Sequence, residues 1–342
     1  MKRKVRNFYH QRFWRRLVFR IALLIMLGVG VWQIGSRDFF SHIDLLRAPQ
    51  QLATRIVLSS EGRSIPAMVM VDNVAFYEEV IPVTNLIDCD VLDLTPLLTV
   101  LENYGDHVAI YFENLASGCT FMHNEERVFF GASIPKAPLA LWLYQQAEKG
   151  LLNLDQTLYF SEQNKRMGSG IIRHRYDFGD VFTLRRLIGL NLYESDNTAT
   201  YMIHQAVGYQ GFSNFINSIG GMTTFGGNAL DSFLTAKQVG RFAHEIYRYI
   251  ESDQNYSAEF KYNLLNNQFP FIVSDYPVAS KTGWYEKLGG AWHDMAIVYA
   301  PSPYILVILS ADKTGTEEDH AIYQNISFAF QEFNGLNFGI GY

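Results

Sequence analysis

The stretch "GASIPKAP" at positions 131–138 places Ser133 three residues before Lys136, directly after two phenylalanines. Residues three apart lie on the same face of a helical turn, so the two side chains are predicted to be neighbours. A serine hydroxyl is a weak nucleophile until another group takes its proton, and a partly buried lysine can be neutral and accept it. Taken alone, the stretch is also typical of a helix-capping serine followed by a surface lysine.

Two further short strings decide between these interpretations. "SDN" stands at 195–197 and "KTG" at 281–283. A chain of this length contains about one S-x-x-K by chance, but only roughly 0.05–0.1 copies of S-D-N or K-T-G. Each string alone is ordinary, since S-D-N often opens a helix and K-T-G often ends a strand. The three together, in this order, favour a catalytic set.

This set resembles that of the class A β-lactamases and penicillin-binding serine hydrolases, which carry S-x-x-K, S-D-N and K-T-G. The resemblance extends from about Leu94 to the C-terminus, with "FFGASIPK", "GSGII", "LYESDNTATYMI", "KTGW" and "HDMAIVYAP" in the family's order. It implies a serine hydrolase that forms an acyl-enzyme with β-lactams or with D-alanyl-D-alanine-type peptidoglycan stem peptides. No cofactor is expected, and the nine histidines show no metal-ligand spacing.

The resemblance gives the first two motifs their roles. Ser133 is the predicted nucleophile and Lys136 its base. Ser195 is predicted to relay a proton to the leaving nitrogen, and Asn197 to hold the substrate amide. Asp196 is expected to be structural, accepting hydrogen bonds from nearby backbone N–H groups.

The third motif is predicted to bind substrate along a strand. Lys281 and Thr282 offer a cation and a hydroxyl to a substrate carboxylate. Gly283 leaves room for a close approach of the substrate backbone. By the resemblance, the oxyanion hole consists of the backbone N–H groups of Ser133 and Trp284.

One departure from the family affects the reaction. Class A β-lactamases hydrolyse the acyl-enzyme with a glutamate on an omega loop, which acts through a water molecule. Here residues 198–230 contain no Asp or Glu, and the first acid is Asp231. Acylation therefore has its full machinery, whereas deacylation is expected to be slow. Two alternatives stay open: a true β-lactamase whose water is activated by Lys136 or Asn228, and a catalytically weak cell-wall binding or scaffold module.

The remaining pattern indicates an α+β fold. Strand-like and helical stretches alternate in a way that predicts one antiparallel sheet flanked by helices, with an inserted all-helical subdomain. The expected elements are a helix from 95 to about 105, two strands within 107–124, a helix over 134–150, a mostly helical region over 151–250, three strands after 277 and a helix over 318–334.

The N-terminus predicts a membrane anchor preceding that fold. Eight Lys or Arg and no acids fall in the first twenty residues, followed by an apolar run. A cleaved signal peptide is the alternative. The positive-inside rule predicts a single-pass protein of the cell membrane, with a cytoplasmic N-terminus and an extracytoplasmic catalytic domain. The predicted parts are a basic cytoplasmic stub (1–16), a transmembrane signal anchor (17–35), a membrane-proximal extracellular segment (36–93) and the hydrolase domain (94–342).

Composition limits the partners. The 342 residues carry a net charge of −6, and without the basic N-terminus the remainder has 20 basic against 34 acidic residues. This acidic body argues against a nucleic-acid partner. Cys89 and Cys119 leave two readings open, one disulfide or two buried thiols. His293 and Asp294 are expected to be structural residues at a strand edge.

Overall fold

The structure is a computed structural model that describes residues 54–55, 69–71, 74–76, 89, 92–221, 232–286, 290–311 and 317–338. The predicted stub (1–16) and anchor (17–35) lie outside these residues. Across the described ranges, no helix combines the length and apolar character needed to cross a bilayer. The predicted boundaries at 16, 35 and 93 therefore stay predictions.

The centre of the fold is a six-stranded antiparallel sheet in the order β1-β5-β4-β12-β11-β10. Every residue of β4, β11 and β12 is buried. Burial on both faces explains why these strands are mostly apolar in the sequence, although Glu113, His293 and Asp294 are also buried in them. The predicted antiparallel arrangement is confirmed. The strands are β1 (Thr54–Arg55), β4 (Val108–Asn114), β5 (Thr120–His123), β10 (Val278–Tyr285), β11 (Ala291–Val298) and β12 (Tyr304–Ser310).

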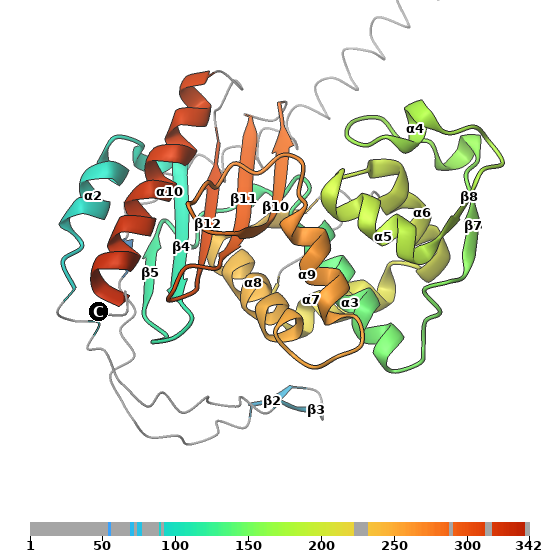
Figure 1. Ribbon diagram of the computed structural model, residues 1–342, viewed down its shortest axis with the longest axis horizontal. Helices are drawn as coiled ribbons and strands as arrows, with labels where there is room; N and C mark the ends of the chain where they lie inside the picture. The colour runs from blue at the N-terminus through green and yellow to red at the C-terminus, as the bar shows by residue number, and fades with distance from the viewer. Residues whose placement is uncertain are drawn as a thin grey trace, which may run out of the picture. The chain divides into compact units, whose positions relative to one another are not determined.

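Helices cover both faces of this sheet (Figure 1). α2 (Thr95–Glu102) and α10 (Glu317–Phe338) pack on one face, and α8 (Ala236–Ile250) packs on the other. The expected helical subdomain lies between β6 and β10 in the sequence, so the α+β architecture is confirmed. Its elements, with those that join them, are α3 (Lys136–Glu148), η3 (Glu162–Asn164), α4 (Ile172–Arg175), α5 (Leu184–Tyr193), α6 (Asn197–Val207), α7 (Gln210–Ser218) and α9 (Ser257–Leu265).

Short strand pairs complete the fold. β6 (Phe129–Phe130) pairs with β9 (Phe233–Leu234), and β7 (Thr157–Tyr159) pairs with β8 (Val181–Thr183). The β6–β9 pair joins the strand before the predicted nucleophile to the residues before α8. A 3₁₀ turn, η2 (Gly105–His107), precedes β4, and β2 (Val69–Val71) pairs with β3 (Val74–Phe76).

A glycine sets how closely α8 approaches the sheet. A Cβ added at Gly240 would lie 2.4 Å from the ring of Tyr111 on β4. Real side-chain contacts do not reach that distance, so the helix requires glycine at this position. The N-terminus of α8 is held by a capping box between Thr235 and Gln238.

The two cysteines form a disulfide, which resolves the open question. Cys89 and Cys119 have Cα atoms 5.9 Å apart and are separated by 30 residues. The bridge lies in the core on the α2 and α10 side of the sheet. It ties the residues before α2 to the start of β5.

Replacing both cysteines with alanine should lower the free energy of unfolding by about 3–4 kcal/mol, because the bridge closes a loop of about 30 residues. Urea denaturation of the oxidised wild type and the double variant measures the difference. Penicillin labelling is the control and should persist, since the bridge lies across the sheet from α3. A loss below about 1 kcal/mol would show that the unfolded chain gains little freedom without the bridge.

Candidate active site

Ser133 lies in a tight turn between β6 and α3. The N–H of Gly131 donates to the carbonyl of Ser232 (2.7 Å), and the N–H of Lys136 donates to the carbonyl of Ser133 (3.2 Å). Between them Ala132 has a φ of 46°, a left-handed conformation that costs an alanine about 1–2 kcal/mol. Ser133 itself stays partly exposed at the end of this turn. The fold thus holds a strained backbone conformation at Ala132, immediately beside the predicted nucleophile.

His293 supports this turn from the sheet. It lies opposite Gly283 in β11, where Nε2 donates to the carbonyl of Phe130 (2.7 Å) and Nδ1 accepts from the N–H of Ser310 (3.2 Å). Burial lowers the pKa of His293 to about 4, consistent with a neutral ring. The expected structural role is confirmed. The expected position at a strand edge is wrong, because β11 lies inside the sheet between β10 and β12.

Lys136 occupies the middle of the site. Its side chain is only 1% exposed, and Nζ lies 2.5 Å from the carbonyl oxygen of Ser195, 3.2 Å from Ser195 Oγ and 2.7 Å from Asn197 Oδ1. Burial lowers the pKa of Lys136 well below its usual value, and the positive charge of Lys281 lowers it further, while Asp196 opposes both. Lys136 is therefore suited to lose its proton and accept another.

Asp196 fixes the second motif. Its Oδ2 accepts hydrogen bonds from the N–H groups of Ile171 (2.7 Å) and Ile172 (2.8 Å), and its Oδ1 accepts from the N–H of Ala199 (2.9 Å). The expected structural role of Asp196 is confirmed. These bonds leave Ser195 in a left-handed conformation, with a φ of 51°. Its carbonyl and hydroxyl can then both face Lys136.

Asn197 joins the second motif to a neighbouring loop. Its Nδ2 donates to the carbonyl of Met167 (2.8 Å), and its backbone N–H donates to the carbonyl of Ser169 (3.0 Å). Gly170 makes this approach possible, since an added Cβ would lie 2.2 Å from the side chain of Asp196. The loop from Met167 to Gly170 is therefore fastened beside Asn197.

Lys281 enters from β10 on the opposite side. Its Nζ donates to Ser195 Oγ (3.1 Å) and to the carbonyl of Thr282 (2.6 Å), and the side chain is fully buried. Burial lowers the pKa of Lys281 to about 7, against the effect of the Asp294 carboxylate. Ser195 Oγ consequently contacts Nζ of both Lys136 and Lys281. A hydroxyl between the two lysine nitrogens is placed to pass a proton.

Gly283 brings β10 against the nucleophile turn. A Cβ added to Gly283 would lie 2.7 Å from the backbone nitrogen of Ser133 and 3.1 Å from that of Ile134. No larger residue fits here without a shift of backbone. The Trp284 indole packs on the far face of the sheet, with its ring 5.5 Å from that of Phe269.

The structure thus gathers the predicted site residues. Direct contacts join Lys136 with Ser195 and Asn197, and Lys281 with Ser195. Ser133 lies against Gly283, next to Thr282 and Trp284 in β10. Their catalytic roles remain predictions.

Two supporting residues belong to none of the predicted motifs. Asn191, fully buried, donates from Nδ2 to the carbonyl of Lys136 (3.1 Å) and accepts from Thr200 Oγ1 (2.8 Å). Asn267 donates to Ser280 Oγ (2.8 Å) beside Thr282. The sequence alone could have pointed to Asn191, because it is the one amide within the apolar run "LIGLNLY".

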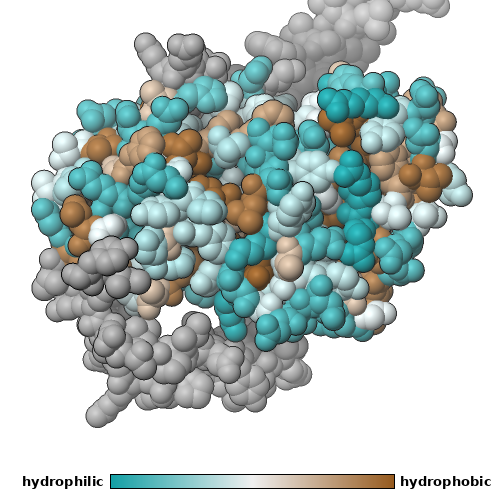
Figure 2. All heavy atoms as spheres, in the orientation of Figure 1, coloured by the Kyte–Doolittle hydropathy of each residue, from teal (hydrophilic) through white to brown (hydrophobic). Residues whose placement is uncertain are grey.

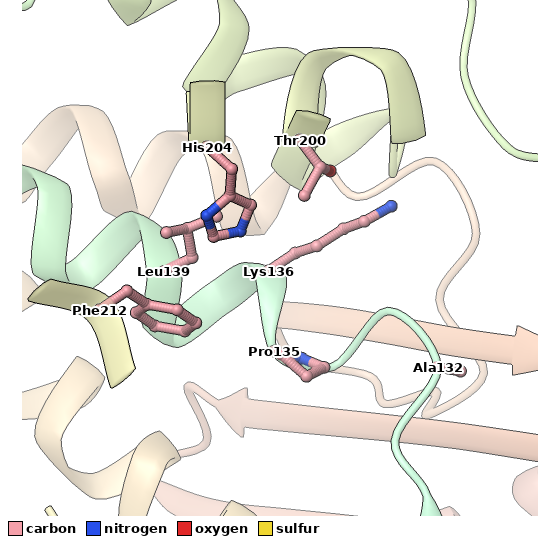
Figure 3. A pocket seen from close by; sticks show the side chains of 7 residues that line it. All are labelled: Ala132, Pro135, Lys136, Leu139, Thr200, His204 and Phe212. Atoms are coloured by element: carbon pink, nitrogen blue, oxygen red, sulfur yellow. The ribbon is translucent and has the colours of Figure 1, made fainter. Parts of the chain in front are cut away.

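A small cavity of about 10 Å³ (the volume open to the centre of a water molecule) lies behind Lys136. Figure 3 shows the lysine stem along its wall, with the ammonium group directed away from it. The His204 side chain also lines the cavity. It is 2% exposed, and its Nδ1 has no hydrogen-bond partner in the described structure. Burial lowers the pKa of His204 to about 4. The space suffices for one water molecule.

Known proteins resemble this chain in sequence profile and in fold. The profile of the Beta-lactamase enzyme family matches residues 95–332. A β-lactamase from Sphaerobacter thermophilus superposes with a TM-score of 0.64 at 19% identity, covering 72% of this chain and 99% of that one. A β-lactamase from Chitinophaga pinensis gives 0.61 at 21% identity, covering 69% and 97%. No curated protein sequence matches the chain.

A further neighbour is a leucine-to-glutamate variant of PBP-A, described as an acyl-enzyme complex with penicillin G. It has a TM-score of 0.61 at 17% identity and covers 70% of this chain and 94% of that one. At such identities these neighbours show the fold, which is the predicted β-lactamase-like one. The profile match over most of the chain shows more: the chain belongs to the β-lactamase enzyme family and is a serine hydrolase of that family.

Proposed function

We propose that this protein is a membrane-anchored, extracytoplasmic acyl-transfer enzyme. It forms an acyl-enzyme on Ser133 with β-lactams or with D-alanyl-D-alanine-type peptidoglycan stem peptides, and releases the acyl group slowly. The observation that carries the proposal is the contact of Lys136 Nζ with both Ser195 and Asn197, beside a partly exposed Ser133.

The proposed acylation follows from these contacts. Neutral Lys136 takes the proton of Ser133 while Ser133 Oγ bonds to the substrate carbonyl carbon. The N–H groups of Ser133 and Trp284 would stabilise the negative charge that develops on the carbonyl oxygen. The proton then passes from Lys136 to Ser195, and from Ser195 Oγ to the leaving nitrogen as the carbon–nitrogen bond breaks. Lys281 would hold the substrate carboxylate.

Slow deacylation follows from the missing acid. A general base has to take a proton from water before water can attack the acyl bond. Asp196, the carboxylate of the second motif, already accepts three backbone hydrogen bonds. Its oxygens are therefore occupied in holding the fold and do not serve as the general base. Residues 198–230 add no other Asp or Glu. The PBP-A variant supports only the acyl-enzyme part of the proposal by analogy, since it was solved as an acyl-enzyme complex with penicillin G.

The membrane and cell-wall parts of the proposal rest on the sequence. The basic, then apolar, N-terminus supports an anchor with the enzyme outside the cytoplasm. An extracytoplasmic location also fits a disulfide, which oxidising compartments favour. Peptidoglycan stem peptides would be accessible there.

Intact-protein mass spectrometry after addition of penicillin tests the proposal. We expect a single stoichiometric adduct on Ser133 that persists for many minutes. A transient adduct with accumulating hydrolysed drug would instead identify a β-lactamase that activates water by another route. No adduct at all would favour a cell-wall binding or scaffold module. The full-length chain in detergent is the appropriate sample.

A further inference from the structure

A group of cations lies beside the second motif of an otherwise acidic protein. Within 165–175 the chain carries four Lys or Arg residues and one histidine. None of these five residues forms an ion pair in the described structure, whereas Arg185, Lys237, Arg248 and Lys261 each pair with a carboxylate. The nearby acids, too, are exposed and pair with none of them. The basic residues are Lys165, Arg166, Arg173, His174 and Arg175, and the acids are Glu162, Asp177 and Asp180.

This cationic segment is fixed to the site. The Asp196 carboxylate accepts hydrogen bonds from the backbone N–H groups of Ile171 and Ile172 at the start of α4. The Met167 carbonyl accepts a hydrogen bond from Nδ2 of Asn197. Figure 1 shows α4 in the upper right of the view, near α6, and Figure 2 shows hydrophilic residues interrupted by apolar ones over that part of the molecule. The backbone of this segment is therefore held in a defined position beside Asn197.

Arg173 is incompletely paired at the centre of the segment. Its Nη1 lies 3.1 Å from Met167 Sδ, a weak acceptor, and its Nε is buried without a partner in the described structure. Leaving a buried donor unpaired is costly, so such a group calls for an explanation. Met167 is 77% exposed, unbranched and free to change rotamer. A change of its rotamer would release Nη1 of Arg173.

Arg166, unlike Arg173, uses its guanidinium for contacts within this part of the structure. Its Nη1 donates to the carbonyls of Gln163 (2.8 Å) and Lys165 (2.9 Å), and its guanidinium lies 3.2 Å from the centre of the Tyr201 ring. Those contacts occupy it in holding the segment together. Arg173 is thus a partly buried guanidinium with donors to spare, and the exposed Lys165 and Arg175 add positive charge on either side.

We propose that Arg173 binds a second carboxylate of the substrate, on the part that lies along the Asn197 wall. This inference rests on the proposed function and names its substrate class: acyl donors with a carboxylate beyond the one assigned to Lys281. The Nη1 and Nη2 donors form a fork that matches the two oxygens of a carboxylate, once Met167 moves aside from Nη1. Lys165 and Arg175 raise the local concentration of such substrates.

The test uses two synthetic stem-type peptides ending in D-alanyl-D-alanine, identical except that an additional glutamyl carboxylate is free in one and amidated in the other. Their dissociation constants are measured on full-length protein carrying Ser133→Ala, which prevents turnover. We expect the free acid to bind about tenfold more tightly. Adding Arg173→Gln should bring this ratio close to one, and Arg173→Lys should keep part of it.

Arg186→Gln is the matched control. Arg186 is an exposed arginine on α5 that hydrogen-bonds Tyr193, outside the site, and its loss should leave the ratio unchanged. An unchanged ratio in Arg173→Gln overturns the inference. So does equal or undetectable binding of the two peptides to the Ser133→Ala protein when penicillin acylates the wild type. If penicillin also fails to acylate the wild type, the proposed function fails with it.

Discussion

Replacing Ser133 with alanine should abolish covalent labelling of the protein by a fluorescent penicillin. The acyl bond needs an oxygen nucleophile, and Ser133 is the partly exposed hydroxyl at the turn where β10 approaches. Only the Oγ atom is removed, so the fold should be retained and the thermal midpoint should stay close to that of the wild type. Intact-protein mass spectrometry and gel fluorescence give the measurement.

Ser195 supplies the control, since it is the other serine of the predicted catalytic set. It is 1% exposed, and both Lys136 and Lys281 contact its Oγ, so it is placed to relay a proton. Ser195→Ala should slow acylation while leaving the adduct on Ser133. Labelling of Ser133→Ala at the wild-type level would disprove the assignment. An adduct mapped to Ser195 would make that residue the nucleophile.

The parts of the fold that were predictable are those that short-range pattern encodes. β4, β11 and β12 are apolar runs bounded by Gly, Pro or Asn, and such runs are typical of buried strands. Ser133 and Lys136 are neighbours through one turn, so their proximity needed no tertiary information. The meeting of three motifs from distant positions was expected only through the resemblance to a family.

The supporting residues could not be predicted because their partners are set by packing. His293 holds the carbonyl of Phe130, which is 163 positions away in the sequence. The spacing of Cys89 and Cys119 allowed a bridge but did not require one. Alanine disfavours the left-handed φ that Ala132 adopts, so the surrounding structure has to impose it. Residues held in locally unfavourable conformations are concentrated at functional sites.

Replacing Lys136 with alanine should slow acylation by roughly 10²–10⁴-fold, because it removes the base that takes the Ser133 proton. The pH dependence has a defined sign. Acylation needs neutral Lys136, so the wild-type rate is lost as pH falls through the lowered pKa of that residue. Lys281, whose pKa is about 7, loses its charge above that pH and binds the substrate carboxylate less well. The wild-type profile should therefore be bell-shaped, and the variant should lose the acidic limb.

A structural role for Lys136 has to be separated from a chemical one, since its Nζ also contacts the buried carbonyl of Ser195 and the Asn197 amide. Exogenous small alkylamines make the distinction. Lys136→Ala leaves a space next to the existing cavity, and an amine that enters it can accept the Ser133 proton. Partial rescue that increases with the fraction of neutral amine supports the base assignment. A Lys136→Ala protein of normal thermal stability that acylates within tenfold of the wild type would place the base elsewhere, with Lys281 the nearest other amine on Ser195.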